Sequence, residues 1–343
     1  MAKQDIENFT LAELKEEISR INEPLFRATQ IFFWLYKKGV REFDEMKNIP
    51  NVLRKKLQQF YYISSLELNQ QFKSKDGTEK FIFKLSDGNF IETVLLYTGQ
   101  RKTVCISTQV GCRFACLFCA SGSNGFIRNL TSSEIINQVL FLQQNLKNKI
   151  TNYVFMGMGE PLDNYENLKR TILIMNGPWA LGIAARRITV STCGLIPGIE
   201  RLKNLGLQIN LAVSLHAAND RLRNTVMPIN KKYPLEKLIK ACEDFIETIG
   251  RMVTLEYIMI KGRNDSLQDA HDLALIAKRL NSKVNLIACS NVGYRKFLPP
   301  AERDIDIFMK RLKRENVKVT LRNSKGSDIN AACGQLAGRI RRL

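Results

Sequence analysis

Residues 103–122, TVCISTQVGCRFACLFCASG, join a short apolar run to a loop that carries three cysteines. The apolar and β-branched residues of 103–109 predict a buried strand. Downstream, the same order of a β-rich run followed by a helical pattern recurs several times. Serial βα units of this kind predict an α/β fold, with a parallel sheet and helices outside it.

The repeated units extend to the C-terminal part of the chain. Predicted strands span 152–158, 187–193, 209–216, 252–260, 284–290 and 317–323, and predicted helices include 131–146, 164–176, 234–249, 266–281 and 302–315. With at least six units, the alternatives are a full or partial barrel and an open doubly wound sheet. Polar residues and glycines just after the strand ends favour a barrel with its site on the C-terminal rim. They are Gly157, Gly159, Glu160, Ser191, Thr192, Ser214, His216, Ser290 and Asn291.

The chain before residue 100 has a different character. Residues 1–62 are charged and amphipathic, with apolar residues three and four apart, and they predict a small basic helical domain. Residues 63–99 hold two Asp-Gly turn signals between alternating runs, and they predict a β-hairpin extension. The predicted organisation is therefore a helical accessory domain (1–62), a β-hairpin extension (63–99) and a βα barrel (100–343).

The charge of the chain indicates a polyanionic partner. Among 343 residues, 52 Lys and Arg exceed 33 Asp and Glu, which gives a net charge of +19. The basic residues are spread widely, which favours a nucleic acid over a small acidic ligand. The longest apolar cluster, 31–36, is far shorter than the roughly 18–20 residues of a membrane span, and the polar start lacks an export signal. We therefore expect a cytoplasmic protein with no membrane partner.

The cysteines carry the strongest chemical signal. Eight of them in a chain without an export signal indicate ligands, catalysts or core residues rather than a disulfide framework. Cys112, Cys116 and Cys119 lie on one short loop, so they can converge on one inorganic centre. A cubane iron–sulfur cluster usually takes four cysteines, and three would leave one iron open for another ligand. The alternative is a structural zinc site completed by Cys105 or His216.

Four motifs, in order along the chain, carry a family resemblance. They are GCRFACLFCASG (111–122), MGMGEPLDN (156–164), SLHAANDRLRNTVMPINKKYPL (214–235) and DINAACGQLAG (328–338). The cysteine spacing resembles that of the radical S-adenosylmethionine (SAM) enzymes. The four motifs together resemble the RlmN/Cfr family of radical SAM RNA adenine methyltransferases, most closely its RlmN branch. The resemblance covers nearly the whole chain and implies a partial (β/α)6 radical SAM barrel.

The resemblance also implies cofactors and partners. One [4Fe-4S] cluster would be held by Cys112, Cys116 and Cys119, with SAM on its open iron. The substrate would be adenine C2 in 23S ribosomal RNA and in certain transfer RNAs, and the electron donor would be a protein such as flavodoxin or ferredoxin. The alternatives are methylation at C8 of the same ribosomal adenine, and a non-catalytic RNA-binding protein with a structural metal site.

The family's reaction implies roles for further residues. There, the cysteine that matches Cys333 is methylated by one SAM, and a 5′-deoxyadenosyl radical from a second SAM abstracts a hydrogen from that methyl. The methylene radical adds to adenine, and the cysteine that matches Cys105 resolves the protein–RNA crosslink as a disulfide with Cys333. The family's proton acceptor matches Glu92, which the residue pattern alone would place on an exposed strand face. Positions that match SAM contacts are Gly159, Glu160, Ser191, Ser214, Leu215, His216 and Asn291.

Three stretches depart from the family's pattern. After the fifth barrel strand the family usually reads VNLIPxNP, whereas this chain has VNLIACSNV (284–292). Either Asn291 or Ser290 therefore matches the SAM-contacting asparagine, and Asn291 is preferred. Asn330 replaces an aspartate, and Ala-Ser-Gly (120–122) stands where Ala-Thr-Gly is commoner. We expect a monomer whose remaining thiols, Cys193, Cys242 and Cys289, belong to the core.

Overall fold

One ten-stranded sheet forms the centre of the protein. The computed structural model describes residues 3–146, 149–290, 297–322 and 324–338. Seven strands of the sheet run parallel, and their spatial order follows their order in the chain. They are β6 (Arg101–Cys105), β9 (Asn152–Phe155), β10 (Ile188–Thr192), β11 (Asn210–Ser214), β12 (Thr254–Met259), β13 (Lys283–Ala288) and β14 (Val319–Arg322).

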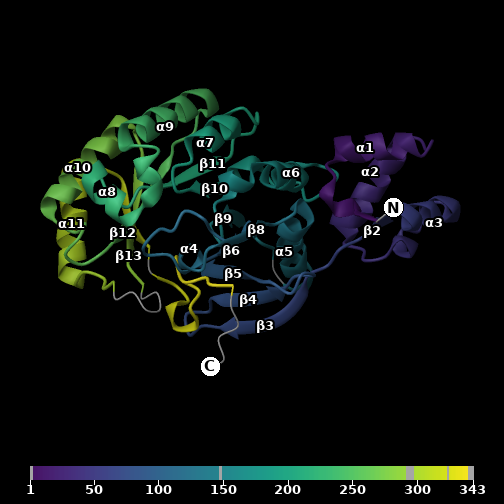
Figure 1. Ribbon diagram of the computed structural model, residues 1–343, viewed down its shortest axis with the longest axis horizontal. Helices are drawn as coiled ribbons and strands as arrows, with labels where there is room; N and C mark the ends of the chain where they lie inside the picture. Colours follow the sequence, from purple (N-terminus) through teal and green to yellow (C-terminus); the bar gives the residue numbers. More distant parts are fainter. Residues whose placement is uncertain (1–2, 147–148, 291–296, 323, 339–343) are drawn as a thin grey trace.

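Helices connect these parallel strands and cover the outside of the sheet (Figure 1). They are α5 (Ser132–Asn145), α6 (Tyr165–Asn176), α7 (Ile196–Lys203), α8 (Asp220–Val226), α9 (Leu235–Ile249), α10 (Leu267–Arg279) and α11 (Glu302–Arg314). Each long helix buries one stripe; α9, for example, buries Leu238, Cys242, Phe245 and Ile249, spaced three and four apart. A doubly wound sheet would reverse its strand order at a switch point. Since this order never reverses, the prediction of a partial barrel is confirmed.

The predicted β-hairpin extension continues the same sheet. Strands β3 (Glu67–Lys73), β4 (Glu79–Lys84) and β5 (Phe90–Thr98) form an antiparallel meander, and β5 pairs with β6. Both turns use the predicted Asp-Gly pairs, because Gly77 (φ 86°) and Gly88 (φ 82°) adopt the left-handed backbone that glycine tolerates best. The extension therefore lies directly beside the first barrel strand.

The N-terminal part is helical, as predicted, and lies at one end of the molecule (Figure 1). Its helices are α1 (Leu11–Arg20), α2 (Phe26–Phe33) and α3 (Asn51–Phe60), and β1 (Gln4–Asp5) pairs with β2 (Tyr61–Tyr62). Arg170 of α6 forms an ion pair with Glu13 of α1 at 2.8 Å. No helix in the described parts of the chain has the length and apolar character that crossing a membrane requires.

A buried carboxyl group, Glu7, joins this N-terminal part to the barrel. Its Oε2 accepts hydrogen bonds from Nδ2 of Asn137 on α5 (2.7 Å) and from Oγ of Ser64 (3.1 Å). Burial, and then the nearby charge of Asp5, raise the pKa of Glu7 to about 8. The folded protein therefore holds a proton here that the unfolded chain releases above its ordinary pKa of 4.5.

This proton makes the stability of the protein dependent on pH. Since the folded state binds more protons than the unfolded state between pH 4.5 and about 8, the free energy of unfolding falls as pH rises through that window. The Glu7→Gln variant keeps the accepting oxygen but has no carboxyl proton to bind. We expect its free energy of unfolding to fall by at least about 1.4 kcal/mol less than that of the wild type over this pH window. Urea unfolding at pH 5.5 and pH 8 measures it, with the exposed Glu16→Gln of α1 as control. Parallel pH profiles of wild type and Glu7→Gln would contradict the prediction.

Candidate active site

The three-cysteine loop (residues 112–119) follows β6 through the short strand β7 (Gln109–Gly111). Ala115, in its middle, has a left-handed backbone with φ of 50°, a conformation that costs an alanine free energy and turns the loop back on itself. The N–H of Leu117 donates to the carbonyl of Val226 on α8 at 3.0 Å. The loop is thereby fixed, and its three cysteines line one cavity.

This cavity lies at the C-terminal ends of the parallel strands and encloses about 830 Å³ of empty space, its mouth included. The three-cysteine loop, the residues that end or follow β9, β10 and β11, and the segment after β14 all contribute to its wall. The predicted site residues that line it are Cys112, Cys116, Cys119, Gly159, Glu160, Ser191, Ser214, His216 and Cys333. Residues from distant parts of the chain thus meet where the barrel prediction placed the site.

Three other predicted residues that the structure describes do not line this cavity. Leu215 is a buried core residue, and Cys105 and Glu92 lie on β6 and β5 behind the wall. Asn291 lies outside the described residues. Its alternative, Ser290, is described and is not among the lining residues.

Glu160 offers a buried negative charge to the cavity. It is 4% exposed, and its carboxylate accepts hydrogen bonds from the backbone N–H groups of Cys193 (2.7 Å) and Leu162 (3.2 Å). Burial raises the pKa of Glu160, while these hydrogen bonds oppose the rise. Because these donors are neutral, a cationic ammonium group in the cavity would gain a strong electrostatic partner here.

His216 and Arg223 both follow β11 in the chain. His216 lines the cavity wall, and Arg223 supports that wall through hydrogen bonds. Burial, assisted by the charge of Arg223, lowers the pKa of His216 to about 3, so its imidazole is neutral. His216 Nδ1 accepts from the N–H of Ile258 at 3.1 Å, and Phe118 packs edge-on against the ring at 4.6 Å. The fully buried Arg223, which lies in the 214–235 motif but was not predicted as a site residue, donates to the carbonyls of Cys193 (2.7 Å) and Leu215 (3.0 Å). It braces the ends of β10 and β11.

Cys333 and Cys105 lie near each other although they are far apart in the sequence. Cys333 is exposed in the cavity wall, and Cys105 is buried on β6. Burial and the neighbouring Cys333 raise the pKa of Cys105 to about 12, while the nearby Arg322 opposes the rise. Both cysteines are free thiols, so the predicted disulfide is not present in this structure.

Arg322 and Glu256 are cavity residues that the sequence analysis missed. Arg322 ends β14, and its Nη1 donates to Oε2 of Glu256 on β12 at 3.3 Å. The position of Arg322 at the C-terminal end of a predicted strand was a usable signal, because site residues gather there in barrels. Glu256 lies within a predicted strand of apolar residues, where its charge was the only signal.

The residue pattern was wrong about Glu92. Instead of lying on an exposed strand face, the residue is buried and only 2% exposed. Oε1 accepts from the backbone N–H groups of Ala337 (3.0 Å) and Gly338 (2.8 Å), and Oε2 forms an ion pair with Lys80 at 3.3 Å. In this structure Glu92 therefore holds the segment that carries Cys333.

The thiol set fits an iron–sulfur cluster. Burial raises the pKa of Cys116 well above its ordinary value, and the neighbouring thiols Cys119 and Cys112 raise it further. Three thiolates together therefore need a cationic centre, which a cluster supplies. Among the described residues, no three His, Cys, Asp or Glu side chains are arranged to hold a single metal ion, whereas a cubane can bind each thiolate to a different iron. For the zinc alternative, Cys105 lies outside the cavity wall and His216 Nδ1 already accepts a hydrogen bond.

Family models match two parts of the chain. The model of the radical SAM superfamily matches residues 106–274, and that of the ribosomal RNA large subunit methyltransferase N-terminal domain matches residues 4–63. Radical SAM enzymes use a [4Fe-4S] cluster and SAM, so the predicted cofactors are confirmed, and the chain is an enzyme.

Individual relatives resemble the chain over nearly its full length. A probable dual-specificity RNA methyltransferase RlmN from Clostridium novyi is 44% identical over 97% of both chains. The dual-specificity RNA methyltransferase RlmN of Geotalea uraniireducens is 44% identical over 99% of this chain and 98% of its own. The crystal structure of a radical SAM methyltransferase from Sphaerobacter thermophilus superposes with a TM-score of 0.92 at 41% identity, over 98% of this chain and 100% of that one. The chain therefore belongs to the RlmN family of the radical SAM superfamily.

Proposed function

We propose that this protein methylates C2 of an adenine in 23S ribosomal RNA, and of an adenine in transfer RNA, through an S-methylcysteine at Cys333. The observation that carries the proposal is the place of Cys333. The chain after β14 brings this exposed thiol into the wall of the same cavity as the three-cysteine loop. The relatives' names, which specify RNA methyltransferases of dual specificity, support the choice of substrate.

The cavity residues have distinct parts in this proposal. Cys112, Cys116 and Cys119 hold the cluster, and Glu160 binds the ammonium group of SAM. Gly159, Ser191, Ser214 and His216 complete the wall around SAM, and Leu215 and Asn291 remain family-matched positions beside them. When bound, the cluster and SAM would supply radical chemistry able to remove a hydrogen atom from a methyl group on Cys333.

Cys105 resolves the protein–RNA crosslink in this proposal. The adenine adduct would first give up its one unpaired electron, back to the cluster, and its C2 proton. The Cys105 sulfur, after losing its proton, attacks the Cys333 sulfur. A disulfide forms, the bond between Cys333 sulfur and the methylene carbon breaks, and its electron pair stays on that carbon, which takes up a proton to become the methyl group. The adjacent Arg322, which lowers the pKa of Cys105 against the effect of burial, favours the required thiolate. A dithiol reductant then restores both thiols. Glu92 has the role of proton acceptor in this proposal, as its match to the family implies.

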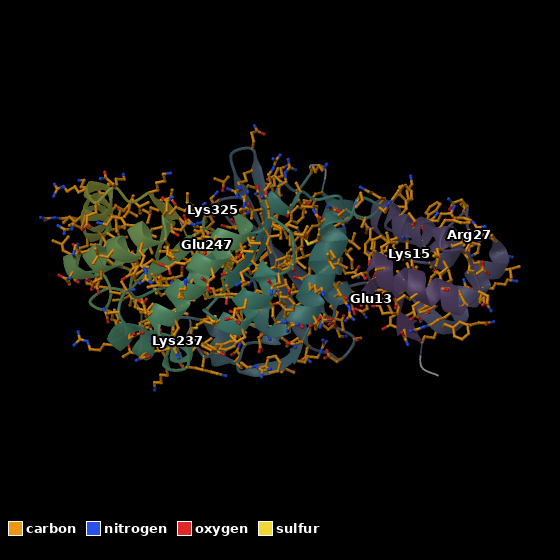
Figure 2. The ribbon with its side chains drawn as sticks, turned by 90° about the horizontal axis from the view of Figure 1, so that it is seen from above. Glu13, Lys15, Arg27, Lys237, Glu247 and Lys325 are labelled. Carbon is orange, nitrogen blue, oxygen red and sulfur yellow. The ribbon has the colours of Figure 1, made fainter. Side chains whose placement is uncertain are left out.

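RNA is held by the basic helical domain (1–62) in this proposal, with the β-hairpin extension (63–99) leading into the barrel (100–343). Lys15 and Arg27 lie on the N-terminal helices, at the end of the molecule opposite Lys237 (Figure 2). The exposed ring of Phe26 lies 4.7 Å from the Arg27 guanidinium, a pairing suited to unstacked bases and phosphates. We further propose that the enzyme is a cytoplasmic monomer, reduced by a donor such as flavodoxin or ferredoxin.

Nucleoside analysis of RNA tests this function. Ribosomal and transfer RNA from cells with and without the gene are digested and compared with C2- and C8-methyladenosine standards. We expect C2-methyladenosine to disappear on deletion and to return with the wild-type gene, but not with a Cys333→Ala gene. Loss of the C8 product would move the assignment to the alternative carbon. Unchanged RNA would contradict the proposal and favour a non-catalytic RNA-binding protein.

A further inference from the structure

The segment that carries Cys333 returns across the molecule to the β-hairpin extension. Residues 324–338 follow β14 and lie beside β3 and β4, which come more than 240 residues earlier in the sequence (Figure 1). This segment has little regular structure of its own, since its only helical element among the described residues is the short turn of Ser327–Ile329. Its position must therefore be set by contacts with other parts of the chain.

The turn between β3 and β4 makes the first set of these contacts, through two carboxylates. Asp76 in the turn accepts from the N–H of Gly326 at 2.8 Å. In the opposite direction, Asp328 accepts from Oγ of Ser74 (2.6 Å) and from the N–H of Lys75 (3.2 Å). Each side thus supplies one carboxylate and one or two donors to the other. Hydrogen bonds with a charged acceptor are among the strongest that a protein makes.

Close packing reinforces these reciprocal hydrogen bonds between the turn and the segment. Gly326 has φ of 70°, and a Cβ on it would lie 2.8 Å from the side chain of Thr78 and 2.8 Å from that of Ala331. The N–H of Ala331 in turn donates to the Gly326 carbonyl at 2.8 Å. The first half of the segment is therefore folded tightly against the turn.

The second half of the segment is held by residues that follow the three-cysteine loop. The N–H of Ala120, just after the three-cysteine loop, donates to the carbonyl of Gly334 at 2.7 Å, and Ser121 Oγ donates to that of Leu336 at 2.6 Å. Glu92 holds the two residues that follow, as described above. Cys333 thus lies between two attachments, with Asp76 and Asp328 on one side and the three-cysteine loop on the other.

We propose that residues 74–78 of the β-hairpin extension form a clasp that positions Cys333, with Asp76 and Asp328 as its positioning residues. Neither carboxylate lines the cavity, so each acts through the segment and not on the reacting atoms. The role of the clasp in catalysis rests on the proposed function, in which the Cys333 methyl group must stay within reach of the radical. A misplaced reacting atom lowers the rate of the chemical step without weakening substrate binding.

The chain contains a matched control for the clasp. Asp87 occupies the equivalent place in the next Asp-Gly turn, and its Oδ1 accepts from Asn89 N–H (3.0 Å) as Oδ1 of Asp76 accepts from Thr78 N–H (2.9 Å). Asp87, however, pairs with Arg128 and Asn89, and among the described residues it forms no hydrogen bond or ion pair with 324–338. Asp87→Asn therefore makes the same chemical change in a similar turn.

Hydrogen exchange of the holoenzyme tests the clasp directly. An asparagine has one accepting oxygen in place of two. Asp76→Asn therefore cannot accept from both Thr78 N–H and Gly326 N–H through separate oxygens, and Asp328→Asn cannot accept from both Ser74 and Lys75 in this way, while the shape of the side chain changes little. We expect amide exchange in residues 324–338 to accelerate roughly tenfold in either variant, with an unchanged thermal midpoint and no change in that segment for Asp87→Asn. In RNA methylation assays, kcat should fall about tenfold while KM for RNA stays constant.

The two readouts separate the possible failures. Unchanged exchange in residues 324–338, or an equal acceleration in Asp87→Asn, would overturn the clasp. Faster exchange with unaltered kcat would also overturn it, because the segment would then be held without positioning the thiol. If wild-type enzyme does not methylate RNA, the proposed function fails, while the exchange measurement still decides whether the turn holds the segment.

Discussion

Replacing Cys333 by alanine is expected to lower RNA methylation by at least about a thousandfold, as removal of a covalent catalytic group does in other enzymes. The reason is that Cys333 is the one exposed thiol among the described residues: Cys105, Cys193, Cys242 and Cys289 are buried, and the half-buried thiols of the three-cysteine loop hold the cluster in the proposed function. Methyl transfer from labelled SAM to RNA measures the loss. Cys242→Ala, which removes a buried thiol on α9, is the control.

Two further measurements show which steps of the reaction the Cys333→Ala variant still completes. It should still bind its cluster and cleave SAM to 5′-deoxyadenosine, because the three-cysteine loop is intact. Mass spectrometry of wild-type protein should find one added methyl unit on the peptide that contains Cys333. RNA methylation by Cys333→Ala at more than about a tenth of the wild-type rate would mean that the methyl group travels by another route.

Replacing Cys116 by alanine should remove the cluster and, with it, all activity. Cys116 is flanked by the other two thiols, so its loss leaves two ligands, too few to retain a cubane that usually takes four cysteines. We expect the variant, purified without air, to lack the brown colour of the wild type and to fall from about four irons per chain to nearly none. Iron assay and the absorption near 400 nm measure this.

Cys193→Ala is the informative control for the cluster. Cys193 lines the same cavity, and burial, together with the nearby Glu160, Cys116 and Cys112, raises the pKa of its thiol well above the ordinary value. The Cys193→Ala variant should keep its iron, because in the proposed function the cluster takes its three cysteine ligands from the three-cysteine loop. Equal loss of iron from Cys193→Ala would identify a fourth cysteine ligand and remove the open iron from the mechanism.

Local patterns in the sequence were enough to predict the rim of the barrel. The strands alternate with helices at regular intervals, and Gly159, Ser191, Ser214 and His216 come just after strands or at their last residues. In a parallel sheet these ends share one edge, so chain position alone predicts that the side chains converge. The three-cysteine loop is likewise a local feature, with its turn at Ala115.

Glu92 could not be placed this way because β5 departs from simple alternation. Residues 91–95 are all buried. On one face Thr93 bonds Gln138 of α5 at 2.7 Å, and on the other Glu92 holds residues 337–338. A strand covered on both faces shows no alternation of polar and apolar positions. The cover here comes from residues about 245 positions away, which no local pattern reveals. Asp328, held by a turn 254 positions earlier, escaped prediction for the same reason.

The order of synthesis gives the clasp a consequence for the cell. All strands of the sheet precede Cys333 in the chain, since β14 ends at Arg322. The turn that binds the segment precedes it too. The ribosome therefore synthesises these parts before Cys333. A chain that stops between Arg322 and Cys333 would contain every strand of the sheet and the three-cysteine loop but not the thiol that meets RNA in the proposed function. Such an incomplete product could not form the covalent link to RNA.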